Sequence, residues 1–400
     1  MSPLQRPTNA SHEVPAPPTE PDLVARALAL GPVLRANAER TERERRMAPE
    51  NLEGLRRSGL LRLTTPTARG GFGVSVRTQV EVGLALGRAC PSTAWVAGIY
   101  NGVEPMTLML SETARDEFYR EGPDVTVCSV ASVHGQAVRA DGGVRFSGTW
   151  TAASGCEDAR WALLGVPLPG PAGSPPSAAT VLVPLEELAV RDTWHVAGMR
   201  GTGSQTLVAD AVLVPDHRVI SAAVAPSGGS GAGFPSALKI GATLNLLAPV
   251  VGAALGALDS VRETLASGRG IIASVYRDTT ASPSAQMWLG EADRLIGHAI
   301  RLVTSAADAA DAALTGDPLT LRERSALRMD MVAAIENARV AMSMLLDLNG
   351  TAGFAESHPL QRYWRDMETG SRHVQFNPFL TREDYGRLAV GIESPVSLLL

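Results

Sequence analysis

Several residue types are scarce in this sequence, and each scarcity excludes a class of protein. There are three cysteines, Cys90, Cys128 and Cys156, and they lie far apart without a C-x-x-C pair. This spacing excludes a disulfide scaffold and a zinc knuckle, so we expect three small buried thiols. Lys239 is the single lysine, which excludes Schiff-base chemistry unless this residue carries it.

Charge and hydropathy exclude further classes of protein. The formal net charge is −5 at pH 7, whereas a nucleic-acid binder needs a basic surface to neutralise phosphates. No apolar run reaches the roughly 18–20 residues that a membrane-spanning helix needs. Residues 1–21 are rich in Pro, contain no apolar core of a secretory signal and are expected to form a disordered tail. The sequence therefore predicts a cytoplasmic protein that binds small molecules rather than nucleic acid or a membrane.

The rest of the chain divides into three parts by the spacing of its hydrophobic residues. Helical spacing runs through 22–124, and over 125–224 the period changes to two, in six segments typical of short strands. The segment Ala140 to Gly143 supplies a hairpin turn between two of them. A linker rich in Gly, Ser and Pro over 225–236 leads into long helical segments over 237–400. We predict an α+β protein with an N-terminal helical domain, a middle antiparallel β-barrel or sandwich and a C-terminal four-helix bundle.

Motifs of the common hydrolases and metalloenzymes are missing from the sequence. It contains no Gly-x-Ser-x-Gly, no His-Glu-x-x-His and no His, Asp or Glu cluster with metal-ligand spacing, so we expect no metal. The segment Gly201 to Ser204 lacks both the lysine and the following helix of a phosphate-binding loop.

Two other segments suit chemistry at a flat heteroaromatic ring. The stretch Ser147 to Cys156 combines small hydroxyl residues with Trp150, although an ordinary strand end is an equal alternative. His373 follows a helical segment with Arg365-Asp366 and two aromatic residues, where its pKa can be tuned. On this pattern alone, a purely structural role for His373 is favoured.

Four segments together resemble the acyl-CoA dehydrogenase superfamily. They are Ser147 to Trp161, Asp192 to Ser204, Val214 to Arg218 and Pro359 to Gly391, and the resemblance covers about residues 22–391. Within the superfamily they are most similar to group D, the oxygenase components of two-component flavin-dependent monooxygenases. A dehydrogenase needs a carboxylate base soon after the Arg-Asp pair, whereas Arg372 to Asn377 contains His373 and no carboxylate. This favours the monooxygenase branch and a functional role for His373.

The resemblance implies an oxidoreductase that uses reduced FMN or FAD, made by a separate reductase, together with O2. A flavin C4a-hydroperoxide would then oxygenate a small organic substrate, and the subunits would form a homotetramer. Ser154 would hydrogen-bond flavin N5, and His373 would steady the peroxide or donate a proton. Further cofactor contacts would come from Trp150, Thr151, Thr202 and Ser204 and, across a subunit boundary, from Arg269 and Gln286. The alternatives are an acyl-CoA dehydrogenase-like FAD oxidoreductase and a flavin-less binding module.

One position departs from the phenol-hydroxylating relatives, which carry a histidine shortly after a Ser-Thr-x-Trp stretch. Here Ser92 to Trp95 is followed by a segment without histidine. Besides Trp95, the candidates for substrate contacts are therefore Tyr100, Asn101 and Glu104, unless the substrate is not a simple phenol. Hydroxylation of a polycyclic or polyketide aromatic, N-oxygenation of an amine, and sulfur or Baeyer–Villiger oxidation stay open.

Overall fold

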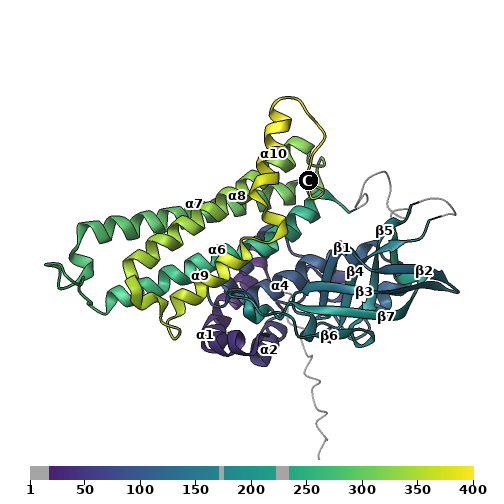
Figure 1. The fold of residues 1–400 in the computed structure, drawn as a ribbon, viewed down its shortest axis with the longest axis horizontal. Coiled ribbons are helices and arrows are strands. Elements are labelled where there is room, and N and C mark those ends of the chain that lie inside the picture. The colour runs from purple at the N-terminus through teal and green to yellow at the C-terminus, as the bar shows by residue number, and fades with distance from the viewer. Residues whose placement is uncertain (1–17, 171–174, 222–233) are drawn as a thin grey trace, which may run out of the picture.

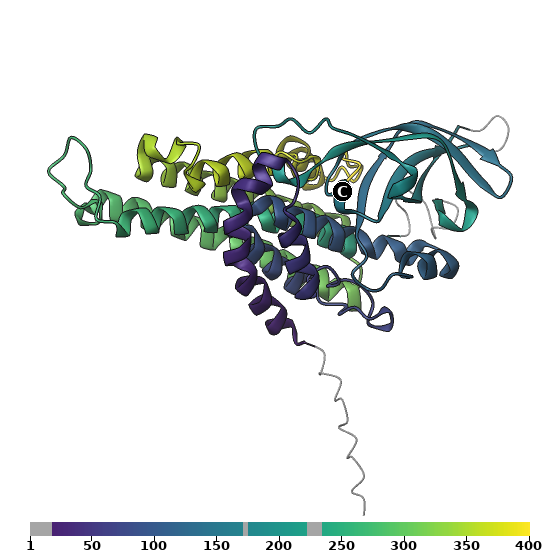
Figure 2. The same cartoon turned by 90° about the horizontal axis from the view of Figure 1, so that it is seen from below.

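The computed structural model describes residues 18–170, 175–221 and 234–400. A β domain and a long helical bundle lie at opposite ends of the molecule, with the N-terminal helices packed beside their junction (Figures 1 and 2). The predicted three-part α+β fold is confirmed. The predicted disorder of the tail concerns residues that lie largely outside the described ranges, as does most of the predicted linker.

The N-terminal part consists of helices whose starts are marked by polar capping residues. They are α1 (Glu20–Glu44), α2 (Pro49–Arg57), α3 (Val76–Gly87), α4 (Pro91–Val103) and α5 (Glu112–Phe118). The backbone N–H and hydroxyl of Thr19 both donate to Asp22 at the start of α1, and Ser75 caps α3 by accepting from the Thr78 N–H. Gly98 of α4 lies so close to the Asn245 carbonyl that a Cβ there would approach it to 2.3 Å. This backbone contact fixes α4 against the bundle.

The middle part is a sandwich of two four-stranded sheets. In one sheet the order is β1 (Val127–Val133), β4 (Trp161–Leu168), β5 (Ser177–Pro184) and β8 (Val219–Ser221), and in the other it is β2 (Gln136–Ala140), β3 (Gly143–Ala153), β7 (Gln205–Pro215) and β6 (Ala189–Arg191). All pairs are antiparallel except β1 with β4, which is parallel. The predicted hairpin is confirmed, because Ala140 pairs with Gly143 across a turn in which Gly142 has φ of 75°. Cys128 and Cys156 are buried in this part and Cys90 in the helical part, and all three are free.

The C-terminal part is a bundle built from long helices. They are α6 (Ser236–Ala266), α7 (Pro283–Thr315), α8 (Leu321–Asn349), α9 (Pro359–Gly370) and α10 (Pro378–Ala389). Small and aliphatic side chains fill the space between α6, α7, α8 and α9, which form the four-helix bundle seen in Figure 1. A capping box of Thr320 and Glu323 starts α8.

Helix α6 contradicts the expectation that no segment is long and apolar enough to span a membrane. By length and composition it meets that test. However, 89% of its most apolar 18-residue window is buried inside the protein. Its hydrophobicity on all sides reflects its position at the centre of the bundle, where α3, α4, α7, α8 and α9 all pack against it.

We expect a methyl group at the contact between α4 and α6 to destabilise the protein. In Gly98→Ala the new Cβ would collide with the Asn245 backbone, and overpacking of this kind typically costs about 1–3 kcal/mol. Thermal unfolding of the variant should therefore occur at a lower temperature than that of the wild type.

Gly386→Ala is the matched control, because Gly386 lies within α10 and a Cβ there meets no atom within 4 Å. Alanine is favoured over glycine in a helix by roughly 1 kcal/mol, so this variant should unfold at the same temperature or higher. A Gly98→Ala protein as stable as Gly386→Ala would contradict the close packing of α4 on α6.

Candidate active site

Side chains from all three parts of the chain meet at Ser154, at the end of β3. The Trp95 indole N–H, from α4, donates to Ser154 Oγ at 3.2 Å. The Trp95 ring in turn meets the His373 imidazole edge to face, with ring centroids 5.4 Å apart. His373 follows α9 directly, so the structure brings together three residues that the sequence analysis selected from distant segments.

The backbone around Ser154 is held in a tight turn. Ala152 and Gly155 both have positive φ, of 60° and 72°, and the Ser154 N–H donates to the Ala152 carbonyl. The Gly155 N–H donates to the Thr202 carbonyl at 2.8 Å, and the Gly155 carbonyl accepts from the Tyr100 hydroxyl at 2.6 Å. The turn is thus tied on one side to the loop before β7 and on the other to α4.

A row of buried hydroxyl groups runs from Ser154 to that loop. Ser154 Oγ lies 2.7 Å from Ser204 Oγ, which lies 2.6 Å from Thr202 Oγ1. The Thr202 hydroxyl donates to the Met199 carbonyl at 2.8 Å. Thr202 and Ser204 are each 2% exposed, and their hydroxyls support Ser154 within the protein. The predicted contacts of these two residues with a flavin stay predictions.

Asp366 of α9 holds the start of this loop. Met199 has φ of 54°, and its N–H donates to Asp366 Oδ1 at 2.5 Å, while Ser92 Oγ donates to Oδ2 at 3.4 Å. The carboxylate is 4% exposed. Burial raises the pKa of Asp366 to about 6, although the hydrogen bond from Met199 opposes the shift. The sequence analysis noted Asp366 only as part of a motif and gave it no role.

The same loop is pressed against the backbone of α9. A Cβ on Gly198 would lie 1.9 Å from the Arg365 carbonyl oxygen, so only glycine fits there. The Arg365 guanidinium donates to the Ala197 carbonyl at 2.6 Å and also pairs with Glu42 of α1, as does Arg362. Ion pairs and a close backbone contact thus fix the loop on α9.

His373 is uncharged at neutral pH. Burial lowers the pKa of its imidazole to about 4. Its Nδ1 accepts from the Gln375 N–H at 3.4 Å, which assigns the ring proton to Nε2. His373 therefore offers a neutral N–H donor beside Trp95. This favours the expected hydrogen-bonding role over that of a charged proton donor.

The predicted contact of Trp150 with a flavin ring is wrong. Trp150 is fully buried between the two sheets, where its indole N–H donates to the Gly165 carbonyl at 2.9 Å. Its ring also meets Phe146 edge to face at 5.5 Å. Trp150 is thus a core residue of the sandwich, whereas Thr151, on the opposite face of β3, is exposed, and its predicted cofactor contact stays a prediction.

Tyr100 and Asn101 do not face a substrate site. The Tyr100 hydroxyl donates its proton to the Gly155 carbonyl. The Asn101 amide donates to the Leu60 and Ala97 carbonyls and accepts from the Leu63 N–H at 2.9 Å. The expected substrate contacts of both residues are therefore wrong, because all of their polar atoms are committed to holding α4 in place.

Glu104 is also committed elsewhere. Its buried carboxyl accepts from the Tyr119 hydroxyl, and burial raises its pKa. Glu104 follows the last residue of α4 and begins a short 3-10 helix, Glu104–Met109. Continuing α4 at roughly 100° per residue puts this position on the side opposite Trp95. The expected contact of Glu104 with a substrate is wrong for this reason, and the spacing alone could have shown it.

Arg269 lies in the connection between α6 and α7, and Gln286 lies in the first turn of α7. Figure 1 shows this connection at the end of the bundle away from the β domain. Arg269 donates to the Asn349 carbonyl at 3.1 Å, and the Gln286 amide donates to the Thr280 carbonyl at 2.7 Å. Asn349 is 1% exposed, and among the described residues its amide N and O have no hydrogen-bond partner. A single chain cannot bring this end of the bundle to Ser154.

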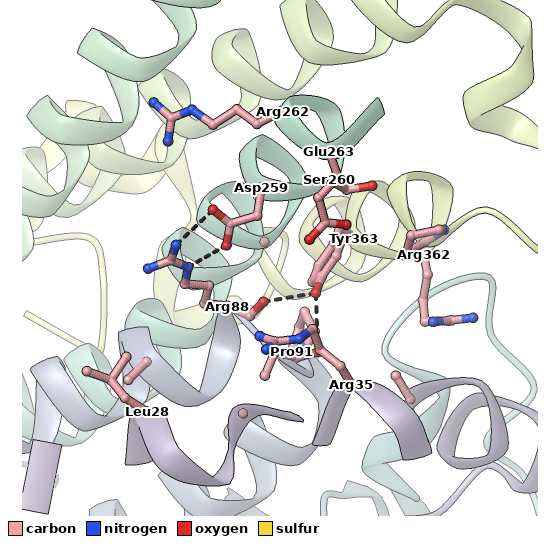
Figure 3. A pocket seen from close by; sticks show the side chains of 16 residues that line it. Leu28, Arg35, Arg88, Pro91, Asp259, Ser260, Arg262, Glu263, Arg362 and Tyr363 are labelled. Carbon is pink, nitrogen blue, oxygen red and sulfur yellow. Dashed lines mark hydrogen bonds and ion pairs between the residues drawn. The ribbon is translucent and has the colours of Figure 1, made fainter. Parts of the chain in front are cut away.

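A cavity of about 640 Å³ opens elsewhere, between α1, α3, α6 and α9 (Figure 3). Its wall contains an ion pair of Arg88 with Asp259, and the Tyr363 hydroxyl donates to the Arg88 carbonyl at 2.9 Å. Ser154 and His373 do not line it. The cavity and the Ser154 site are therefore separate features.

Comparison with known proteins shows relatives that cover nearly the whole chain. The family models "Acyl-CoA dehydrogenase, N-terminal domain" and "Acyl-CoA dehydrogenase, C-terminal domain" match residues 25–121 and 244–378. The oxygenase component of an FADH2-dependent resorcinol hydroxylase from Rhizobium sp. is 33% identical, covering 93% of this chain and 94% of its own. The HsaA oxygenase subunit of a flavin-dependent monooxygenase from Rhodococcus jostii is 32% identical, covering 91% and 97%.

The structure of XiaF from Streptomyces sp., in complex with FADH2 and glycerol, superposes with a TM-score of 0.88. XiaF is 35% identical in sequence, and the match covers 94% of this chain and 97% of XiaF. The chain thus belongs to the acyl-CoA dehydrogenase superfamily, in its branch of flavin-dependent oxygenase components of two-component monooxygenases.

Proposed function

We propose that this flavin-dependent monooxygenase oxygenates an electron-rich aromatic substrate, using O2 and reduced flavin supplied by a separate reductase. The observation that carries the proposal is the convergence of Ser154, Trp95 and the uncharged His373 at one point between the β domain and the bundle. Ser154 presents a hydroxyl oxygen, His373 presents a neutral N–H, and Trp95 presents an aromatic ring.

The residues at this point suit the flavin ring. A reduced flavin supplies the electrons that activate O2, so that one oxygen atom passes to the substrate and the other leaves as water. Ser154 Oγ would bind ring N5, and His373 Nε2–H would donate to oxygen at the reacting edge. Donors fixed before the reaction in a site that excludes water stabilise developing charge most strongly. Thr151, exposed beside the Ser154 turn, is proposed to contact the same cofactor.

We place the phosphate tail of the flavin against Arg269 and Gln286 of a second subunit. Both lie far from Ser154 in their own chain, and the Arg269 guanidinium is a cation suited to a phosphate. Ile272 and Val275, in the same region, are 88% and 87% exposed, as expected of a surface that another copy covers. This arrangement requires at least two subunits, and the homotetramer stays a prediction. A cytoplasmic location stays a prediction.

The side chains around His373 favour a flat aromatic substrate over an amine or a sulfur compound. Trp95 and Phe376 both pack on the imidazole ring, at centroid distances of 5.4 and 6.1 Å. Several relatives are named for aromatic substrates, including resorcinol and indole-3-acetate. Because α4 offers neither Tyr100, Asn101 nor Glu104 as a base, we infer a ring that is nucleophilic without deprotonation.

A dehydrogenase reaction requires a free carboxylate base, and the arrangement gives no support to one. Asp366 is the carboxylate that α9 places next to the site, and both of its oxygens accept hydrogen bonds from the protein. It is therefore a structural anchor of the Met199 loop rather than a base that removes a substrate proton. If the protein were a flavin-less binding module, the convergence of Ser154, Trp95 and His373 would have no ligand to bind.

His373→Ala is expected to uncouple flavin oxidation from product formation. Losing one preorganised donor in an active site typically slows the chemical step about 10²- to 10³-fold. We expect product formed per reduced flavin consumed to fall steeply, while reduced flavin itself still binds. Anaerobic titration and product analysis with an aromatic substrate measure the two quantities separately.

His134→Ala serves as the control, since His134 is exposed at the end of the β1 strand, away from Ser154. It should leave coupling unchanged. A His373→Ala enzyme with wild-type coupling would remove His373 from the proposed mechanism.

The buried carboxyl of Asp366 should make stability depend on pH. Its folded pKa of about 6 lies above the ordinary value of 3.8, so the carboxyl contributes stability below about pH 4 that is lost as pH rises through 6. Asp366→Asn keeps an oxygen for the Met199 N–H and cannot ionise. We expect the melting temperature of the variant, relative to wild type, to increase from pH 4 to pH 6.5.

The comparison is made by thermal unfolding of both proteins across the same buffers. Because other groups titrate equally in both proteins, their difference isolates position 366. A difference that is constant with pH, or that changes in the opposite direction, would show that Asp366 does not titrate in this window.

A further inference from the structure

Counting protons along the buried hydroxyl row fixes the direction of every hydrogen bond in it. The Met199 carbonyl can only accept, so the single proton of the Thr202 hydroxyl points to it, at 2.8 Å. Thr202 then has no proton for Ser204, and Ser204 must donate to Thr202 across their 2.6 Å contact. By the same argument Ser154 must donate to Ser204 across 2.7 Å.

This direction leaves Ser154 Oγ as an acceptor toward any ligand. Its one proton is used by Ser204, and one of its two lone pairs accepts from the Trp95 N–H at 3.2 Å. The remaining lone pair can accept one more hydrogen bond. Ser154, Thr202 and Ser204 are all more than nine-tenths buried, so water cannot replace any bond of the row.

The two redox states of a flavin differ in what N5 can do. In the reduced ring N5 carries a hydrogen and donates, whereas in the oxidised ring N5 is a bare acceptor. We propose that Thr202 and Ser204 are positioning residues that polarise the Ser154 hydroxyl, so that the site selects reduced over oxidised flavin. This inference rests on the proposed function, in which Ser154 binds N5.

For Ser154 to donate to an oxidised ring, the whole row must reverse. Ser204 would then donate to Ser154, and Thr202 would donate to Ser204. The bond from the Thr202 hydroxyl to the Met199 carbonyl would be lost, whereas the bond from the Thr202 backbone N–H, at 3.2 Å, would remain. That carbonyl is held in place, because it also accepts from the Trp194 indole N–H at 2.9 Å. Since the reversal gives up one hydrogen bond, we expect the row to contribute about fivefold to the preference for reduced flavin.

The selectivity for reduced flavin has a use in a two-component system. The oxygenase must capture reduced flavin from its reductase and release the oxidised product of the cycle. A Ser154 hydroxyl that can only accept a hydrogen bond favours the binding of reduced flavin. It also favours the release of oxidised flavin, whose N5 has no hydrogen to donate. The polarity comes from the Met199 carbonyl, which is fixed by groups that a ligand at Ser154 does not touch.

Thr202→Val tests the inference by removing the bond that sets the direction. Without an acceptor at position 202, the Ser204 proton turns to Ser154, and the Ser154 proton becomes free for N5. The dissociation constants of FADH2 and FAD are measured separately, by anaerobic titration and by fluorescence. We expect the ratio of the FAD constant to the FADH2 constant to fall about fivefold, equal to a lowering of the bound flavin's potential by about 20 mV.

Thr202→Ser keeps the hydroxyl and should retain the wild-type ratio. This control distinguishes the loss of the hydroxyl from a change in the shape of the side chain. Ser204→Ala is a second, independent variant, because it removes the acceptor of the Ser154 proton and should lower the ratio in the same way. Wild-type ratios in Thr202→Val or in Ser204→Ala, with FADH2 binding intact, would overturn the inference while leaving the proposed function in place. Failure of the wild-type protein to bind both FADH2 and FMNH2 would instead overturn the proposed function.

Discussion

The contact between the Asp366 carboxylate and the Met199 N–H is the interaction on which the rest of the site depends. A buried carboxylate is costly unless it is hydrogen-bonded, and here the partner is a backbone group in the left-handed region of φ. The bond fixes the Met199 peptide, whose carbonyl starts the hydroxyl row that ends at Ser154. From Ser154 the contacts continue through Trp95 to His373, which follows the helix that carries Asp366. The contacts therefore close into a ring that joins all three parts of the chain.

Close backbone packing makes this ring rigid. Gly98 brings α4, and with it Trp95, against α6, and Gly198 brings the Met199 loop against α9. At Gly370 a Cβ would lie 2.7 Å from the Met199 methyl group, with Trp95 and Val250 also in contact distance. At Gly98 and Gly198 the added Cβ would meet backbone atoms, so a larger side chain would shift α4 or the Met199 loop, whereas at Gly370 the end of the Met199 side chain would have to move. The glycines therefore contribute to the site geometry alongside the polar residues.

The sequence predicted what depends on local periodicity or on the family motif. The change of period from helical spacing to alternation separated the β domain from the helices, and the hairpin at Ala140 to Gly143 followed from its glycines. The alternation of β3 also indicated that Trp150 is buried. Val144 and Phe146 lie an even number of residues away, on the same face of the strand, and are core residues. The resemblance to the family led instead to the prediction that Trp150 contacts a flavin, and that prediction was wrong.

What could not be predicted depends on contacts between distant segments. The pairing of Ser154 with Ser204 joins residues 50 positions apart, and the bond of Asp366 to Met199 spans 167 positions. No pattern in either segment specifies these partners. Thr202 and Ser204 were assigned to the cofactor because of the resemblance to the family, not because of any partner visible in the sequence. Only the packed structure shows that their hydroxyls are used within the protein.

The ring also separates charge from the reacting surface. His373 is neutral because burial lowers its pKa, and the hydroxyl row carries no charge. The buried carboxyl of the ring, Asp366, contacts the Met199 N–H rather than Ser154. Burial raises its pKa to about 6, and the hydrogen bond from Met199 opposes that shift. The surface offered by Ser154, Trp95 and His373 is thus built from neutral groups. On such a surface a ligand is distinguished by the directions of hydrogen bonds rather than by ion pairing. This is why the orientation of a single hydroxyl proton can decide which form of a cofactor is bound.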